Sequence, residues 1–170
     1  VDREAARVLQ ESRAFGIHSV REVRSGRSFL IQGPRERTAV ERAARSLLVD
    51  PLVEQWDIRP LGGDDASSTA RGNGNGPQHR LLNVLFKPGV TDNVAASTQS
   101  ALKGLGIDAE AVSTCRKYWV NASATDDDLA LLGRRVLSND AIEQVVDGAL
   151  AMRSLSLGGA YEFQLRSVSL

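Results

Sequence analysis

This sequence has few of the residues on which cross-linked folds and metal sites depend. It contains a single cysteine, Cys115, so an internal disulfide is excluded. Its two histidines, His18 and His79, are too few for a cysteine–histidine zinc site. No apolar run approaches the ~20 residues that a membrane-spanning helix needs, and residues 1–4 (VDRE) do not resemble the start of a signal peptide. We therefore expect a cytoplasmic protein, and the absence of an initial methionine predicts a fragment or a processed chain.

The chain also lacks an excess of charge of either sign. Lysine plus arginine number 21, and aspartate plus glutamate number 21, which gives a net charge of zero. Such a balance does not attract polyanions, so neither a nucleic acid nor a membrane surface is expected as a partner. The hydrophobic content of 42% is that of a globular protein, and 170 residues can form two small domains, each of about 70 to 80 residues.

Two motifs superficially resemble ligand sites. Residues 72–76 (GNGNG) resemble a phosphate-binding loop, but no strand precedes them and no helix follows, which favours a linker. Residues 126–128 (DDD) resemble a metal-ligand cluster. Thr125 followed three residues later by an acid is, however, the pattern of a helix N-cap. Acidic side chains in the first turn also interact favourably with the helix dipole.

No residue set in the sequence has the spacing of a catalytic site. Paired carboxylates, a nucleophile motif and a nucleotide-binding loop are all absent, so we expect no catalytic, cofactor-binding or metal-binding residues in this chain. Four cationic residues lie in two predicted turns: Arg24, Arg27, Arg116 and Lys117. Solvated turn residues are the simpler interpretation, and docking onto an acidic partner is the alternative.

The apolar pattern of the chain repeats after 89 residues. In each copy the apolar residues follow the i, i+3, i+4, i+7, i+8 spacing of one helix face. The matching sets are Val40, Ala43, Ala44, Leu47 and Leu48, and then Leu129, Leu132, Gly133, Val136 and Leu137. Upstream of a one-residue gap the offset is 90, so that residues 15–17 (FGI) match residues 105–107 (LGI), and in each the glycine suits the left-handed position after a helix.

Each copy is predicted to contain a helix, a β-hairpin with a polar turn at 23–31 or 112–120, a second helix and a strand. The second copy has an additional opening strand at 81–86, which completes a ferredoxin-like β-α-β-β-α-β unit. The first copy lacks this strand, and the alternating segment 161–166 is a candidate to cover the resulting edge. We therefore predict an α+β pseudo-dimer with antiparallel sheets and helices on one face. Its parts are repeat 1 (1–60), a flexible linker (61–78), repeat 2 (79–150), and a loop with a C-terminal strand (151–170).

Several short motifs resemble the small PurS subunit of phosphoribosylformylglycinamidine synthase. They are residues 82–92 (LNVLFKPGVTD), 105–107 (LGI), 115–117 (CRK) and 137–143 (LSNDAIE), with residues 47–54 (LLVDPLVE) in the first copy. Two such copies in one chain resemble the N-terminal region of the large, fused form of this enzyme.

The resemblance implies a place in purine biosynthesis, in which formylglycinamide ribonucleotide is amidated with glutamine and ATP. It implies that ATP and Mg²⁺ bind the synthetase part, and that glutamine is hydrolysed on a glutaminase part. The PurS-like chain would then be a scaffold without cofactors, whose partners are these two parts and which supports ammonia transfer between them.

Two other functions share a similar strand order. A stand-alone regulatory module of the ACT type would bind a small effector between paired ferredoxin-like units. An acylphosphatase-like enzyme would need an arginine in the loop after the first strand, and residues 87–90 (KPGV) contain none. The regulatory module is therefore the main alternative.

Overall fold

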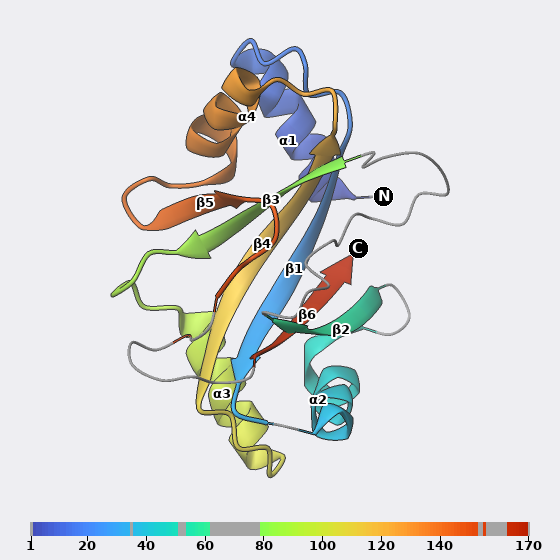
Figure 1. Ribbon diagram of the computed structural model, residues 1–170, viewed down its shortest axis with the longest axis vertical. Helices are drawn as coiled ribbons and strands as arrows, with labels where there is room; N and C mark the ends of the chain where they lie inside the picture. The colour runs from blue at the N-terminus through green and yellow to red at the C-terminus, as the bar shows by residue number, and fades with distance from the viewer. Residues whose placement is uncertain are drawn as a thin grey trace. The chain divides into compact units, whose positions relative to one another are not determined.

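The computed structural model describes residues 2–34, 36–50, 54–61, 79–152, 155 and 163–169. The fold is α+β (Figure 1). The helices are α1 (Arg3–Ala14), α2 (Arg37–Ala43), α3 (Asn93–Gly104) and α4 (Asp126–Leu132), and α2 and α4 continue into π-helical turns η1 (Ala44–Leu48) and η2 (Gly133–Leu137). The strands are β1 (Val23–Gln32), β2 (Gln55–Leu61), β3 (His79–Phe86), β4 (Ala111–Asn121), β5 (Glu143–Asp147) and β6 (Phe163–Ser169).

The predicted linker at 61–78 lies outside the described residues, except for Leu61 at the end of β2. None of the helices in the described ranges combines the length and the apolar character that crossing a membrane requires.

The two predicted β-hairpins are wrong, because β1 and β4 are each one continuous strand. The polar residues that suggest turns instead form hydrogen bonds to aspartate carboxylates from within the strands. Ser25 donates its N–H and its hydroxyl to Asp2, each at 2.7 Å. Thr114 donates in the same way to Asp92, at 2.8 and 2.6 Å. The second copy is consequently β-α-β-α-β and not β-α-β-β-α-β.

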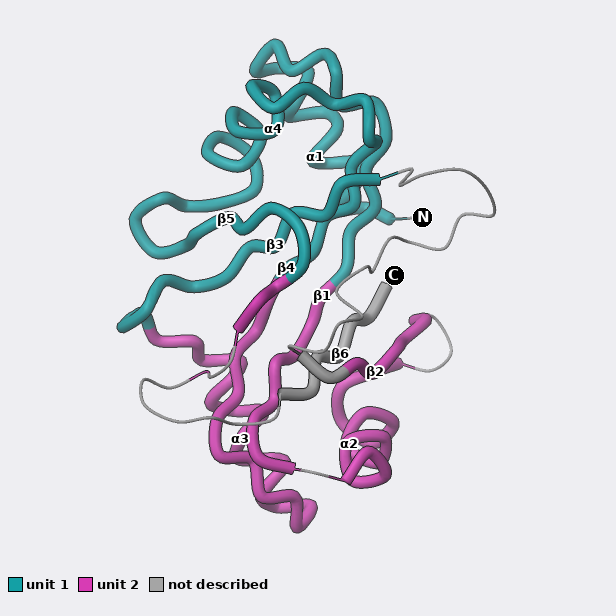
Figure 2. The backbone as a smooth tube through the Cα atoms, viewed as in Figure 1, with its two compact units in different colours: residues 1–26, 67–90, 116–149 teal, residues 27–66, 91–115, 150–170 magenta. Residues whose placement is uncertain are grey.

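The chain forms two compact units that do not coincide with the halves of the sequence repeat (Figure 2). Unit 1 comprises residues 1–26, 67–90 and 116–149, and unit 2 comprises 27–66, 91–115 and 150–170. Both long strands divide between the units, β1 after Gly26 and β4 after Cys115. Each unit therefore contains one helix from each copy: unit 1 has α1 and α4, and unit 2 has α2 and α3.

The strands of unit 1 follow the order β1-β4-β3-β5. Strands β3 and β5 pair in antiparallel fashion, with Val84 opposite Val145. At the edge of this unit the Asn121 N–H donates to the carbonyl of Glu22 at 3.2 Å, which joins the end of β4 to the start of β1. The opening strand of the second copy thus lies between two strands of its own copy.

The strands of unit 2 follow the order β2-β6-β1-β4. Strand β6 pairs in antiparallel fashion with β2, with Trp56 opposite Val168. The predicted C-terminal strand is therefore confirmed, but it fills an inner place and does not cover an outer edge. Because β1 and β2 correspond to β4 and β5, this inner place is the one that β3 takes in unit 1. The C-terminus thus supplies the strand that the first copy lacks.

Each unit has its own hydrophobic core, built on the predicted helix faces. In the second copy all five residues of the repeated stripe are buried, and in the first copy Leu47 is the exception, 41% exposed. The core of unit 1 includes Val8, Tyr118 and Leu132, and the core of unit 2 includes Phe29 and Leu102. Burial of one such side chain contributes about 1.5 to 3 kcal/mol. Helices from different copies therefore share a core in both units.

Aspartate carboxylates begin helices α1 and α3 and also bind the long strands. The Asp2 carboxylate accepts from the Ala5 N–H at 2.8 Å, and that of Asp92 accepts from the Ala95 N–H at 2.9 Å. Each is an N-cap that also holds Ser25 or Thr114. The predicted N-cap of α4 is confirmed as well, since Thr125 accepts from the N–H three residues later.

Replacing Asp92 by alanine should destabilise the protein by about 2 kcal/mol, because the change removes a helix cap and leaves the Thr114 N–H without its acceptor. Asp92→Asn should cost less, since its side-chain oxygen can still cap α3. Urea denaturation followed by circular dichroism measures both. Asp108→Ala, at an exposed position just after the same helix, is the control and should change little. Equal stability of Asp92→Ala and Asp108→Ala would contradict the double role of Asp92.

Candidate functional site

The structure places the four cationic candidates within strands and not in turns. Arg24 and Arg27 lie in β1, and Arg116 and Lys117 lie in β4. Arg24 is exposed and forms an ion pair with Glu22 at 3.4 Å. Lys117 is buried, with 3% of its surface exposed. The docking role of these four residues stays a prediction, and Arg24 is the member whose side chain is most open to a partner.

Arg27 joins the end of η1 to the start of β2 in unit 2. Its guanidinium donates to the Glu54 carboxylate at 3.0 and 3.3 Å and to the Leu48 carbonyl at 3.4 Å. Glu54 also accepts from the Asp50 N–H at 2.9 Å. The last carbonyls of a helix have no partner within the helix, so an arginine at this point satisfies one of them.

Arg116 makes the same set of bonds in unit 1, 89 residues later. It donates to Glu143 at 2.7 Å and to the Leu137 carbonyl at 3.0 Å. Glu143 accepts from the Asn139 N–H at 2.9 Å, as Glu54 does from Asp50. We call each set an Arg–Glu clasp. The two clasps show which residues of the two copies correspond in the structure, at an offset of 89. Arg27 and Arg116 thus stabilise the helix-to-strand connections.

Unit 1 has a polar network of three side chains, two of which have apolar counterparts in unit 2. The Tyr118 hydroxyl donates to Glu4 at 2.8 Å, and Arg7 donates to the same carboxylate at 2.7 and 2.9 Å. Burial raises the pKa of Tyr118 to about 12. The hydrogen bond from Arg7 holds the pKa of Glu4 below its ordinary value. In unit 2 the corresponding positions are Phe29 and Val94.

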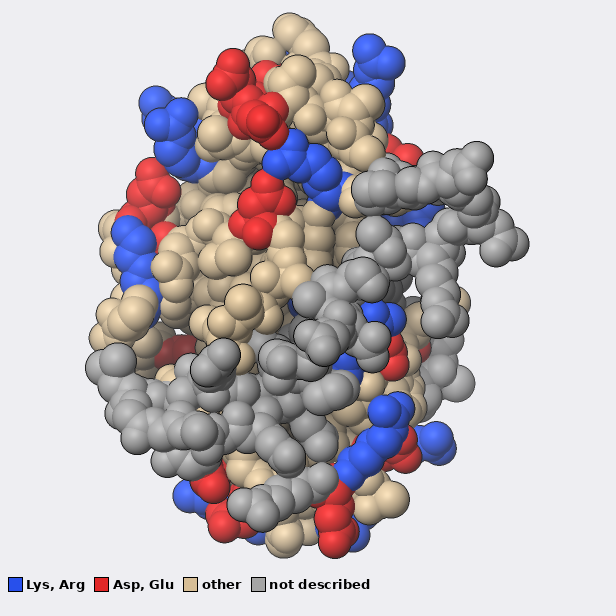
Figure 3. Space-filling view, viewed as in Figure 1, with Lys and Arg blue, Asp and Glu red and all other residues tan. Residues whose placement is uncertain are grey.

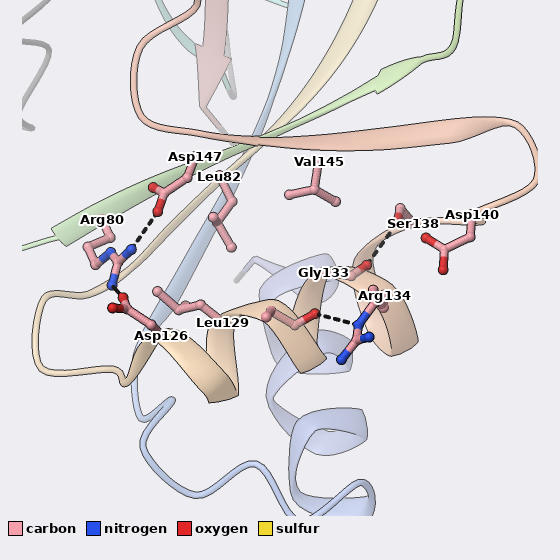
Figure 4. A pocket seen from close by; sticks show the side chains of 11 residues that line it. Arg80, Leu82, Asp126, Leu129, Gly133, Arg134, Ser138, Asp140, Val145 and Asp147 are labelled. Atoms are coloured by element: carbon pink, nitrogen blue, oxygen red, sulfur yellow. Dashed lines mark hydrogen bonds and ion pairs between the residues drawn. The ribbon is translucent and has the colours of Figure 1, made fainter.

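A pocket of about 550 Å³ opens in unit 1 between the strands β3 and β5 and the helix α4 with η2 (Figure 4). Leu82 and Val145 extend from the strands toward α4, where Leu129 lies on the facing helix. A volume of this size lies in the range of small-molecule sites, which is about 300 to 1,000 Å³. This pocket is the candidate functional site.

Charged residues lie at the two ends of the pocket (Figure 4). At one end the Arg80 guanidinium forms ion pairs with Asp126 of α4 and Asp147 of β5, which ties the helix to the strand. Arg134 and Asp140 lie at the other end. Over the face drawn in Figure 3, the described acidic and basic side chains intermix and form no large field of one sign. The pocket thus combines an apolar middle, with Leu82, Leu129 and Val145, and charged ends.

Gly133 leaves part of the pocket wall without a side chain. A Cβ atom built on it would lie 3.4 Å from a Val145 methyl group, which is ordinary contact. The corresponding residue in the first copy is Ala44, which is buried. The glycine is therefore not required by its surroundings, and it makes the pocket larger.

Sequence reasoning missed the pocket. Arg80 and Asp147 are 67 residues apart, so no local pattern connects them. Gly133 did carry a signal, since it is the one glycine within the repeated apolar stripe. Among the residues that the structure describes, no group of three or more His, Cys, Asp or Glu side chains is arranged to hold a metal ion.

No family model and no curated protein matches this chain. Its function is therefore inferred from the geometry of its own residues and from the motif resemblance given above.

Gly133→Ala should raise the free energy of unfolding by about 0.5 to 1 kcal/mol, because alanine is the better helical residue and its methyl group fits against Val145. Thermal and urea denaturation measure the change. Gly104→Ala in α3, where a Cβ atom would meet nothing within 4 Å, is the control for helix propensity alone. A loss of stability in Gly133→Ala, with a gain in Gly104→Ala, would contradict the presence of space for a methyl group beside Val145.

Glu4 should contribute to stability at neutral pH and lose that contribution in acid. Because its pKa is lower in the folded than in the unfolded chain, the contribution is present above the unfolded pKa and falls as the pH drops through the folded pKa. Urea denaturation between about pH 5 and pH 3 should show a shallower loss in Glu4→Gln than in the parent chain. Tyr118→Phe keeps the Arg7 contact and should keep most of the slope. A Glu4→Gln slope equal to that of the parent would contradict the assigned ion pair.

Proposed function

We propose that this chain is a non-catalytic, PurS-like bridging module of phosphoribosylformylglycinamidine synthase. Its work would be to link the synthetase and glutaminase parts so that ammonia released from glutamine reaches the substrate. ATP and Mg²⁺ would bind the synthetase part. The observation that carries the proposal is that the chain contains a pair of similar units. Strand β6 takes in unit 2 the place that β3 takes in unit 1, so one chain contains two equivalent units, as a pair of small subunits would.

Two exposed apolar side chains at equivalent positions support a docking role. Phe15 follows α1 and is 49% exposed, and Leu105 follows α3 and is 41% exposed. Each precedes a glycine in the left-handed region, Gly16 at φ +74° and Gly106 at φ +73°, which ends the helix and presents the preceding side chain. Large apolar side chains are typical of the buried centre of protein interfaces. We assign them, with Arg24, to the contact with the partner parts.

The test is reconstitution of activity from separate parts. Adding this chain to the matching synthetase and glutaminase parts should restore glutamine-dependent turnover, while ammonia-dependent turnover should stay mostly unchanged because the synthetase site is not altered. Phe15→Ala and Leu105→Ala should each lower the restored glutamine-dependent rate. Val94→Ala, which shortens another exposed apolar residue on α3, is the matched control and should not.

A chain that neither binds the two parts nor changes the ratio of the two rates would contradict the proposal. Calorimetry against a panel of amino acids and nucleotides separates the alternative, the ACT-type regulatory module. Micromolar binding to the isolated chain, combined with no effect on turnover, would favour that module.

A further inference from the structure

The two units differ at the place where unit 1 has its pocket. The Arg–Glu clasps align the copies at an offset of 89, which pairs Val145 with Trp56 and Arg134 with Arg45. In unit 2 the Arg45 guanidinium lies over the Trp56 ring, 5.5 Å from its centroid. In unit 1 both counterparts, Val145 and Arg134, line the pocket.

Smaller residues leave this place open in unit 1. Valine stands where unit 2 has tryptophan, and Gly133 stands where unit 2 has Ala44. The indole ring that lies beneath Arg45 in unit 2 therefore has no counterpart among the residues of the pocket. Unit 2 thus shows a flat aromatic ring beneath the guanidinium of Arg45, which is the counterpart of Arg134.

The charges around the pocket define the rest of the ligand. Asp126, Asp140 and Asp147 line it together with Arg80 and Arg134, so carboxylates outnumber guanidinium groups by three to two. A carboxylate can only accept hydrogen bonds, and each can accept several, so Asp126 and Asp147 retain acceptor capacity beside Arg80. At the corresponding positions unit 2 has Arg37 and Ile58 in place of Asp126 and Asp147. The acidic end that Asp126 and Asp147 form is therefore specific to the open pocket.

We propose that the pocket of unit 1 binds a small aromatic amine, with its planar ring between Val145 and the Arg134 guanidinium and its ammonium group at an acidic end. The volume of about 550 Å³ accommodates a bicyclic ring with an aminoalkyl substituent. This site is separate from the bridging role and does not rest on it.

The test is a titration of the 170-residue chain, observed by ¹H–¹⁵N NMR, with three probes. The second and third probes each differ from the first in one feature. Tryptamine has the ring and the ammonium group, indole-3-acetate has the ring with a carboxylate, and 2-cyclohexylethylamine has the ammonium group without a planar ring. Tryptamine should bind with a Kd of about 1 mM or tighter. It should shift the amide signals of Gly133, Arg134 and Val145, and the other two probes should bind at least several-fold more weakly.

Variants locate the bound probe. Val145→Trp introduces the residue of unit 2 and should abolish tryptamine binding by filling the pocket. Arg134→Ala should weaken it about 2- to 5-fold, the effect of one exposed cation–π contact. Trp56→Val should create a second site in unit 2 that takes the indole ring without preferring the amine, because Asp126 and Asp147 have no acidic counterparts there.

The proposal is overturned if tryptamine shifts no signals of pocket residues, if indole-3-acetate binds as tightly as tryptamine, or if Val145→Trp binds tryptamine undiminished. If Val145→Trp does not fold, the probe series and Arg134→Ala still decide the question, since neither depends on refilling the pocket.

Discussion

Two carboxylates, those of Asp2 and Asp92, each begin a helix and bind a long strand near its start. The rest of the arrangement depends on this double contact. Because the backbone N–H of Ser25 or Thr114 donates to the carboxylate, the polar residues at these points are satisfied in an extended strand and need no turn. Strands β1 and β4 can then remain continuous and contribute to both compact units.

Continuous central strands bring helices and strands of different copies together. Helix α1 belongs to the first copy but shares a core with α4 and β4 of the second, and α3 of the second copy shares a core with β1 and α2 of the first. In unit 1 the contact between copies includes a hydrogen bond, from the Tyr118 hydroxyl of β4 to Glu4 of α1. The equivalent positions hold Phe29 and Val94, which cannot form that bond.

Local patterns predicted the local structure well. The apolar stripes, the Thr125 cap and the left-handed Gly16 and Gly106 all follow from residues within a few positions of one another. The hairpins failed because a serine or threonine bonded to a distant aspartate has the same composition as a turn. The acidic run was also only partly understood from sequence. Asp128 accepts from the Ser19 N–H and hydroxyl, at 2.9 and 2.6 Å, and no sequence pattern connects these residues.

The pocket and the exchange of helices depend on contacts between residues far apart in the chain, which sequence periodicity does not encode. The internal repeat nevertheless allows the two units to be compared residue by residue. The two Arg–Glu clasps are 89 residues apart, and the same offset pairs Val145 with Trp56. Differences between the units then become informative, because the shared positions are known.

A double-mutant cycle on Glu4 and Tyr118 tests the shared core most directly. Glu4→Val and Tyr118→Phe introduce the pair found at the equivalent positions of the other unit, and the free energy of unfolding is measured for both single variants and for the double variant. If α1 of the first copy packs on β4 of the second, the double variant should be more stable than the sum of the single effects predicts, with a coupling energy of about 1 kcal/mol or more. Additivity within about 0.3 to 0.5 kcal/mol would contradict the exchange of helices between the copies.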